Sequence, residues 1–371
     1  QRLSRLHEIV QTFDIQVGQP PKPAMPDFQP LPVGADGEAH AKAVAATGSL
    51  PYTVYFGNLH SQTNDSDGGG ALGSCTSSQP AQTGAFGPAD AFAYARGRSL
   101  DFLMASEHNH YFDGSSNTNT AANPVVARNR YAAGRTAAST FNSANPGFLA
   151  IYGMEWGVIA NGGHLNILNA DLLAAWEYSS SGQLIGDVFT AKSNYPALYA
   201  TMRTRNWIGQ FNHPSTSATD GQFKVGTTLL GFNADGYEVM VAAEILNSSA
   251  FSTNTTESET GRSSYESAFK TFLERGYRIA PTTNCANWGA SYSNRTGVLI
   301  PNGTALSASA FEAAMRARRV FATEEKTSQV VLTANGRLMG ERFASSGALN
   351  LVVNFASSAG DSVSKVEIFG G

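Results

Sequence analysis

Charged residues are scarce in this chain: they make up 15% of its 371 residues, against ~25% in a typical globular protein. The formal net charge is −4, and no stripe of Lys and Arg stands out, so the sequence lacks the electrostatic footprint of a nucleic-acid-binding protein. Apolar runs are short, and none reaches the ~18 residues of a membrane-spanning helix. These absences argue against binding to nucleic acid and against a helical membrane protein.

Cysteine is nearly absent too. The two residues, Cys75 and Cys285, could form one disulfide or be two buried thiols, because spacing alone does not decide between them. The polar, lysine-poor composition is typical of an exported protein, so we expect a periplasmic or extracellular location. The chain begins at Gln1 and shows no signal peptide.

Two familiar catalytic motifs are missing. The chain has no Gly-x-Ser-x-Gly, so a serine-hydrolase elbow has no support. The glycines of residues 66–73 are not followed by Gly-Lys-Ser/Thr, so they do not form a phosphate-binding loop. Any hydrolytic chemistry must therefore come from other residues.

Strand-like and helix-like segments alternate about seven times between residues 51 and 325. The expected strands are 53–60, 100–106, 148–156, 164–170, 206–213, 239–247 and 277–284. The expected helices are 88–98, 123–144, 195–205, 265–276 and 308–319. Such alternation predicts an α/β domain with a parallel, barrel-like sheet.

The two ends of the chain differ from this pattern. Residues 1–16 have apolar residues at the spacing of an amphipathic helix, and the Pro-, Gly- and Ala-rich residues 17–50 read as an extended strap. Residues 326–371 predict a small β unit, because an Asn335-Gly336 pair signals a hairpin and residues 348–357 and 363–371 alternate as strands do. The alternation continues to Gly371, which leaves open whether the unit is complete.

Histidines stand beside the strand-like runs. The chain has seven histidines, and His60, His108, His164 and His213 each lie in or at the end of such a run, as does Glu155. Strand ends are where a barrel collects functional side chains. Imidazole and carboxylate together suit Zn²⁺, Mn²⁺ or Fe²⁺. The pattern therefore predicts a metal site.

The order of these motifs resembles that of the PHP (polymerase-and-histidinol-phosphatase) superfamily of metallohydrolases. The motifs are HSQTNDSDG (60–68), SEHNH (106–110), GMEWG (153–157), GGHLN (162–166), NHP (212–214) and AEILN (243–247). The set is most similar to the exported, carbaryl-hydrolase-like branch, over roughly residues 52–345. This resemblance implies a distorted (β/α) barrel in which metal ions activate water, so that no Ser or Cys nucleophile is needed.

The resemblance assigns roles to the residues. We expect two or three divalent transition-metal ions (Zn, Mn or Fe), held by His60, Asp67, His108, Glu155, His164 and His213. Glu155 would bridge two ions because a carboxylate has two oxygens. We expect Glu155, His164 and His110 to act on the substrate, and Gln62, Glu107 and Glu244 to stand behind the ligands and orient them.

The sequence departs from the family pattern in two places. Gln62 stands where the family has its second histidine, and the closing Asp-x-His is missing where residues 277–284 run straight into Cys285. Either residues are missing between Asn284 and Cys285, or the site has lost two ligands. Structural alternatives also exist for His164 as a core residue, Asp67 as a turn residue, Glu244 as a paired carboxylate and His110 as a loop residue.

The leading hypothesis is a metal-dependent hydrolase of a small ester, with phosphoesters as the default substrate. Resemblance to the carbaryl-hydrolase branch keeps carbamate and carboxyl esters open. The low Lys and Arg content disfavours a large polyanionic substrate. The alternative is a degenerate barrel without metal that serves as a binding protein. The sequence does not predict the oligomeric state.

Overall fold

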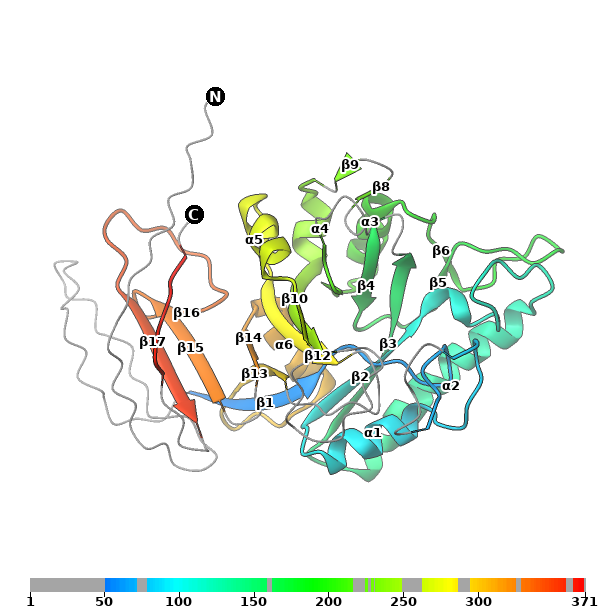
Figure 1. Cartoon of the computed structure of the whole chain (residues 1–371), viewed down its shortest axis with the longest axis horizontal. Helices are drawn as coiled ribbons and strands as arrows, with labels where there is room; N and C mark the ends of the chain where they lie inside the picture. Colours follow the sequence, from blue (N-terminus) through cyan, green and yellow to red (C-terminus); the bar gives the residue numbers. More distant parts are fainter. Residues whose placement is uncertain are drawn as a thin grey trace. The chain divides into compact units, whose positions relative to one another are not determined.

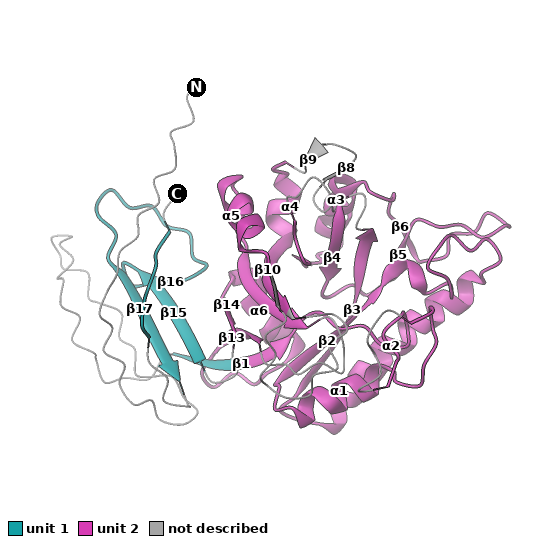
Figure 2. Cartoon of the chain, viewed as in Figure 1, with its two compact units in different colours: residues 1–54, 327–371 teal, residues 55–326 magenta. Residues whose placement is uncertain are grey.

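The computed structural model describes residues 51–71, 79–158, 162–215, 224–225, 228–229, 231–248, 262–285, 294–324, 328–357 and 363–369. The helix and strap expected over residues 1–50 lie outside this part, as does Cys75. The chain divides into two compact units, Gln1–Val54 with Thr327–Gly371 and Tyr55–Lys326 (Figure 2). None of the described helices is long and apolar enough to cross a membrane.

The larger unit is built on a ten-stranded sheet that is nearly closed (Figure 1). Its order is β11-β10-β7-β4-β3-β2-β1-β13-β14, and β12 pairs with β10. The strands are β1 (Tyr52–Asn58), β2 (Phe102–His108), β3 (Leu149–Val158), β4 (Gly163–Ile167), β7 (Gly209–Phe211), β10 (Met240–Ser248), β11 (Arg262–Ser264), β12 (Ala280–Cys285), β13 (Arg295–Pro301) and β14 (Val320–Thr323).

The prediction of a parallel sheet is confirmed for two groups of strands and wrong for others. Strands β1, β2 and β3 are parallel to one another, as are β7, β10 and β12. Strand β4 is antiparallel to both β3 and β7. Only residues 159–162 connect β3 to β4, and a parallel pair needs a crossover of a dozen residues or more. Strands β11 and β14 are also antiparallel to their neighbours.

Hydrogen bonds of side chains connect β12 to β1 and β13, on the side of the sheet away from β10. Oδ1 of Asn58 in β1 accepts the backbone N–H of Cys285 at 2.7 Å, and Oγ1 of Thr283 donates to the Arg295 carbonyl at 2.6 Å. Asn284 and Cys285 are consecutive residues of β12, paired with residues 247 and 248 of β10. The hypothesis of additional residues between them stays a prediction.

In the described part of the chain, six α-helices accompany the sheet. They are α1 (Pro88–Gly97), α2 (Pro124–Ala144), α3 (Tyr195–Thr204), α4 (Ala234–Val239), α5 (Glu266–Glu274) and α6 (Ala308–Ala317), and a short 3₁₀ helix, η1, spans Asn109–Tyr111. All five helices predicted between residues 51 and 325 are present. Helices α1, α2 and α3 have a proline in their first turn, where its fixed φ and missing N–H cost nothing. Helix α4 is too short for a periodic pattern to reveal it.

The sheet buries both of its faces. Successive residues of β2 alternate between two cores: Leu103 packs in the same cluster as Phe92 of α1, and Phe102 packs in the same cluster as Phe311 of α6. The rings of Phe102 and Phe311 lie 5.0 Å apart. Phe102 opens β2, so α6 covers the end of the sheet where β2 begins. The opposite end, where β2 finishes at His108, is left to polar side chains.

The smaller sheet contains β15 (Ser328–Ala334), β16 (Arg337–Leu338) and β17 (Leu351–Ser357) in the order β16-β15-β17. The predicted hairpin at Asn335-Gly336 is confirmed, and both residues have the positive φ, 50° and 73°, of a tight hairpin turn. The strand predicted at 363–371 is wrong for residues 363–369, which form no strand. An alternating pattern of apolar and polar residues does not form a strand unless a neighbouring strand is there to hydrogen-bond with it. Short pairs join β5 (Ala174–Ala175) to β6 (Val188–Phe189) and β8 (Lys224–Val225) to β9 (Thr228–Leu229).

Candidate metal centre

Five predicted site residues gather at one end of the large sheet. His60 follows β1, His108 ends β2, Glu155 lies in β3, His164 lies in β4 and His213 follows β7. Strand register explains the convergence, because His108 pairs with Glu155 and the residue two positions after Glu155 pairs with His164. Residues as far apart in sequence as His60 and His213 thus meet at a single carboxylate.

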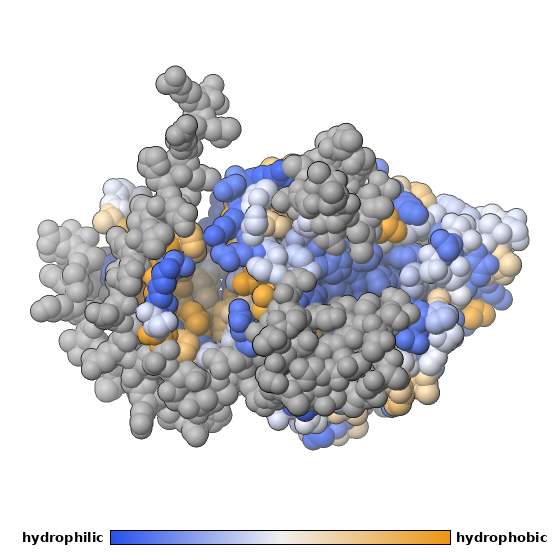
Figure 3. Space-filling model, in the orientation of Figure 1, coloured by the Kyte–Doolittle hydropathy of each residue, from blue (hydrophilic) through white to orange (hydrophobic). Residues whose placement is uncertain are grey.

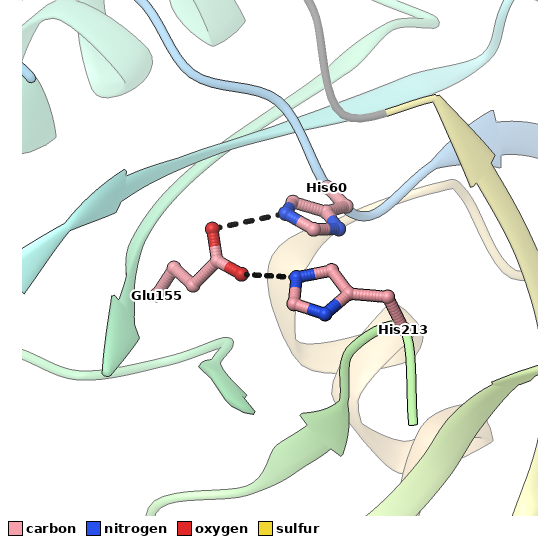
Figure 4. A group of neighbouring side chains, drawn as sticks. All are labelled: His60, Glu155 and His213. Atoms are coloured by element: carbon pink, nitrogen blue, oxygen red, sulfur yellow. Dashed lines mark hydrogen bonds and ion pairs between the residues drawn. The ribbon is translucent and has the colours of Figure 1, made fainter. Parts of the chain in front are cut away.

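The Glu155 carboxylate is the centre of the cluster, and Figure 4 shows it facing His60 and His213. Its Oε2 atom lies 3.0 Å from His60 Nε2 and 3.3 Å from His108 Nε2. Its Oε1 atom lies 3.1 Å from both His164 Nδ1 and His213 Nε2. Each oxygen of one buried carboxylate therefore faces two imidazoles.

Two groups of donor atoms could each hold a metal ion. One contains His60, Glu155 and His213, the other His108, Glu155 and His164, and within each group the donor atoms lie within 4.8 Å of one another. Both groups share Glu155, which suits a bridging carboxylate. Nδ1 of His164 is buried without an aligned hydrogen-bond partner although Glu155 lies beside it. The donor set therefore fits two divalent cations.

Two further carboxylates stand behind the imidazoles. Glu244 Oε1 lies 2.9 Å from Nδ1 of His60. Asp67 Oδ1 lies 2.9 Å from Nδ1 of His108 and belongs to neither donor group of the described residues. This contact is typical of a carboxylate that orients a ligand. The role of Asp67 as a direct ligand stays a prediction.

Burial and charge act against each other in this cluster. Burial by itself would lower the pKa of His60 and His108, but nearby carboxylates outweigh it and raise their pKa values to about 10 and about 9. Burial lowers the pKa of His164 to about 4. Burial would raise the pKa of Glu155, yet the imidazoles of His60, His164 and His108 hold it well below its usual range. When no cation is bound, two imidazolium ions therefore offset part of the negative charge of Glu155, Glu244 and Asp67.

Glu107 was expected to orient a metal ligand, but its hydrogen bonds go to the loop after β1. It accepts hydrogen bonds from the Thr63 backbone N–H at 2.9 Å, Thr63 Oγ1 at 2.6 Å and Ser66 Oγ at 2.5 Å, so it fixes the loop after β1 rather than an imidazole. Burial raises its pKa to about 8. The same loop carries Gln62, whose Nε2 donates to Glu155 Oε2 at 2.6 Å. Gln62 thereby stands beside the bridging carboxylate.

Sequence reasoning missed a set of buried asparagines. Asn212 donates to Glu155 Oε1 at 2.9 Å and to Asn166 Oδ1 at 2.8 Å. Asn284 and Asn247 donate to the two oxygens of Glu244, at 2.9 and 3.1 Å. These amides fix both carboxylates in place. The signal was present, since each Asn interrupts a strand-like apolar run, where a polar side chain needs a partner.

The remaining predicted residue, His110, lies beside the donor groups and not within them. Its ring centroid is 5.9 Å from that of His108, and its buried Nδ1 has no aligned hydrogen-bond partner. His213 shows backbone strain: its φ of 29° is uncommon for a residue other than glycine. The His213 ring that this strained backbone carries contacts Glu155 Oε1.

A pair of acids near the centre makes stability depend on pH. Burial, together with the facing Glu177 carboxylate, raises the pKa of Asp113 to about 7. The folded protein then binds more protons than the unfolded chain between pH ~4 and ~7, so stability should fall as pH rises through this window. We expect Asp113→Asn to be more stable than the wild type at pH 8 and equal to it near pH 4. Urea unfolding at both pH values checks this, and identical pH profiles would contradict it.

The fold and the site define a mixed α/β protein with a candidate His–carboxylate metal centre. No family model and no curated protein matches the chain. Its structure is similar to that of a two-domain protein from Bacteroides vulgatus that contains a predicted PHP-like metal-dependent phosphoesterase: 15% identity over 74% of this chain and 66% of that one, with a TM-score of 0.42. It is also similar to PsfC from Pseudomonas syringae: 12% identity over 73% of this chain and 91% of that one, with a TM-score of 0.40. The chain thus spans slightly less than two thirds of the first structure, and likenesses this distant carry no information on activity.

Proposed function

We propose that this protein is a metal-dependent phosphoesterase of the PHP type that hydrolyses a small phosphoester. The supporting observation is the meeting of four imidazoles, from four separate segments of the chain, at the one carboxylate of Glu155. Burying so many ionisable groups is costly unless they are paired or bind metal. Packing alone would be served better by apolar side chains, so the cluster is best explained by chemistry.

The hydrogen bonds behind the ligands prepare them for a cation. A proton on Nδ1 of His60 is held by Glu244, and a proton on Nδ1 of His108 is held by Asp67. In both residues Nε2 is then the atom left for an ion, and Nε2 is the atom that faces Glu155. Fixing the tautomer in this way is what an orienting carboxylate does.

Bound ions would supply an activated water and positive charge for the phosphoryl oxygens. His60 and His213 would hold one ion, His108 and His164 the other, and Glu155 would span both. His164 is then a ligand rather than a contact of the leaving group. His110, whose Nδ1 has no aligned partner, would be the residue that hydrogen-bonds the substrate.

Metal content and substrate range test the proposal together. Purified protein should contain close to two transition-metal ions per chain and hydrolyse p-nitrophenyl phosphate or bis-p-nitrophenyl phosphate. Hydrolysis of a naphthyl carbamate alone would show a carbamate hydrolase instead. Less than one ion per chain and no turnover of any substrate would show a degenerate binding protein.

A further inference from the structure

A row of side chains leads from the candidate centre towards solvent. The ring of His110 lies 5.9 Å from that of His108, the ring of Trp176 stacks on His110 at 5.6 Å with an interplanar angle of 28°, and Nζ of Lys192 lies 5.8 Å from the centroid of the Trp176 ring. Each step is thus shorter than 6 Å. None of His110, Trp176 and Lys192 belongs to the donor groups.

The row is fixed to the same strand as the bridging carboxylate. Trp156, the neighbour of Glu155 in β3, is fully buried and meets Trp176 edge to face at 5.4 Å. Its Nε1 donates to Thr190 Oγ1 at 2.8 Å, two residues before Lys192. The position of the row relative to Glu155 is therefore set by buried packing and not by a loose surface loop.

A second anchor is Asn109, which is buried between His108 and His110. Its Nδ2 donates to the Ala174 carbonyl at 3.0 Å, two residues before Trp176, and its Oδ1 accepts the Gly157 backbone N–H at 3.3 Å. One side chain thus joins β3, η1 and the segment that carries the tryptophan. Supporting hydrogen bonds of this kind are expected where side chains must bind a substrate in a fixed geometry.

Lys192 brings positive charge to a region rich in carboxylates. Its side chain is exposed, its contact is the face of Trp176, and it forms no ion pair with any described residue. The neighbouring Glu177 is buried and hydrogen-bonded to Thr118 and Asp113, and its carboxylate also attracts the Lys192 ammonium group without forming an ion pair with it. A substrate with a negative charge far from its ester would be repelled by Asp67 and Glu155 but attracted by Lys192. The space-filling view shows a recessed hydrophilic area in the region where Figure 1 draws β3 and β4 (Figure 3).

We propose that Trp176 and Lys192 form the subsite for the leaving group of the substrate, and that this group carries a second anionic substituent. The inference deepens the proposed function and rests on it: the phosphoester lies at the Glu155 centre, the leaving group lies along His110 and Trp176, and its anion is paired with Lys192. The anion is a carboxylate or a second phosphate, and the ammonium group of Lys192 suits both.

Three matched substrates test the subsite: phenyl phosphate, 4-carboxyphenyl phosphate and 1,4-phenylene bisphosphate. The wild type should have a KM about fivefold lower for a charged substrate than for phenyl phosphate, the scale of an exposed charge pair. Lys192→Gln should remove this preference with little change in kcat, and Lys192→Arg should restore it. The preference should also weaken in 0.5 M NaCl. The charged substrate with the larger Lys192-dependent preference identifies the anion.

Lys270→Gln is the matched control, because this partly exposed lysine on α5 pairs with Glu266 instead. Trp176→Leu should reduce the preference as well, since the ring positions Lys192. Equal KM values in the wild type, or a preference that survives in Lys192→Gln, would overturn the subsite while leaving the phosphoesterase intact. If no substrate is hydrolysed, the proposed function fails. Calorimetric binding of phenylphosphonate and 4-carboxyphenylphosphonate then decides the subsite separately, and equal or absent binding would overturn it.

Discussion

Replacing Glu155 with glutamine should lower kcat for phosphoester hydrolysis by at least ~10³-fold, equivalent to about 4 kcal/mol of activation barrier. The amide has nearly the volume of the carboxylate, but it lacks the charge and the two equivalent oxygens that face His60, His108, His164 and His213. Both donor groups would be broken at once, because they share this residue. Steady-state kinetics together with metal analysis measures the loss.

Two other substitutions calibrate this result. Glu312→Gln makes the same chemical change in a surface ion pair with Arg316 and should leave activity unchanged. Asp67→Asn should cost only ~10–100-fold, the effect of losing an orienting partner of a ligand. A loss as deep as that of Glu155→Gln would instead make Asp67 a direct ligand. Wild-type activity in Glu155→Gln, with a native circular dichroism spectrum, would remove Glu155 from the chemistry.

The sequence predicted what depends on local pattern. Helices α1 and α2 follow from apolar spacing and a proline in the first turn, and the hairpin between β15 and β16 follows from Asn335-Gly336. The histidine motifs beside strands also predicted correctly which segments would meet, because the ends of neighbouring strands lie at one edge of a sheet.

What the sequence could not predict depends on tertiary partners. The antiparallel direction of β4 results from the short connection after Val158, which a periodicity pattern does not register. Asp67 and Glu107 were placed by motif order, but their positions depend on which imidazole or loop each one reaches in space. The amides that fix Glu155, such as Asn212, have no motif of their own. The sequence therefore indicates what chemistry a side chain can perform, but it does not indicate which residue that side chain will contact.

The charge balance of the centre links folding to metal binding. Without cations, protons on His60 and His108 offset part of the charge of the buried Glu155, Glu244 and Asp67 carboxylates. Cations compete with those protons for the same imidazoles. The protein is therefore expected to fold with protons in place of metal, and to exchange them when metal arrives. The same arrangement accounts for a buried, highly charged cluster in a chain with few charged residues.

Removal of the metal ions should abolish hydrolysis and expose this exchange. Reloading chelator-treated protein at pH 7 should release about two protons per chain, because His60 and His108 have pKa values of about 10 and about 9. In the metal-free protein these raised pKa values contribute stability that is fully present below the unfolded value of ~6.5 and is lost as pH rises towards 10. The loaded protein should not show this loss, and at a free ion concentration of ~1,000 times Kd it should be more stable by about 4 kcal/mol. Thermal unfolding from pH 6 to pH 10, with an indicator dye for the released protons, measures both effects. Glu155→Gln should show neither, and a chelated wild type that kept its activity would refute the metal centre.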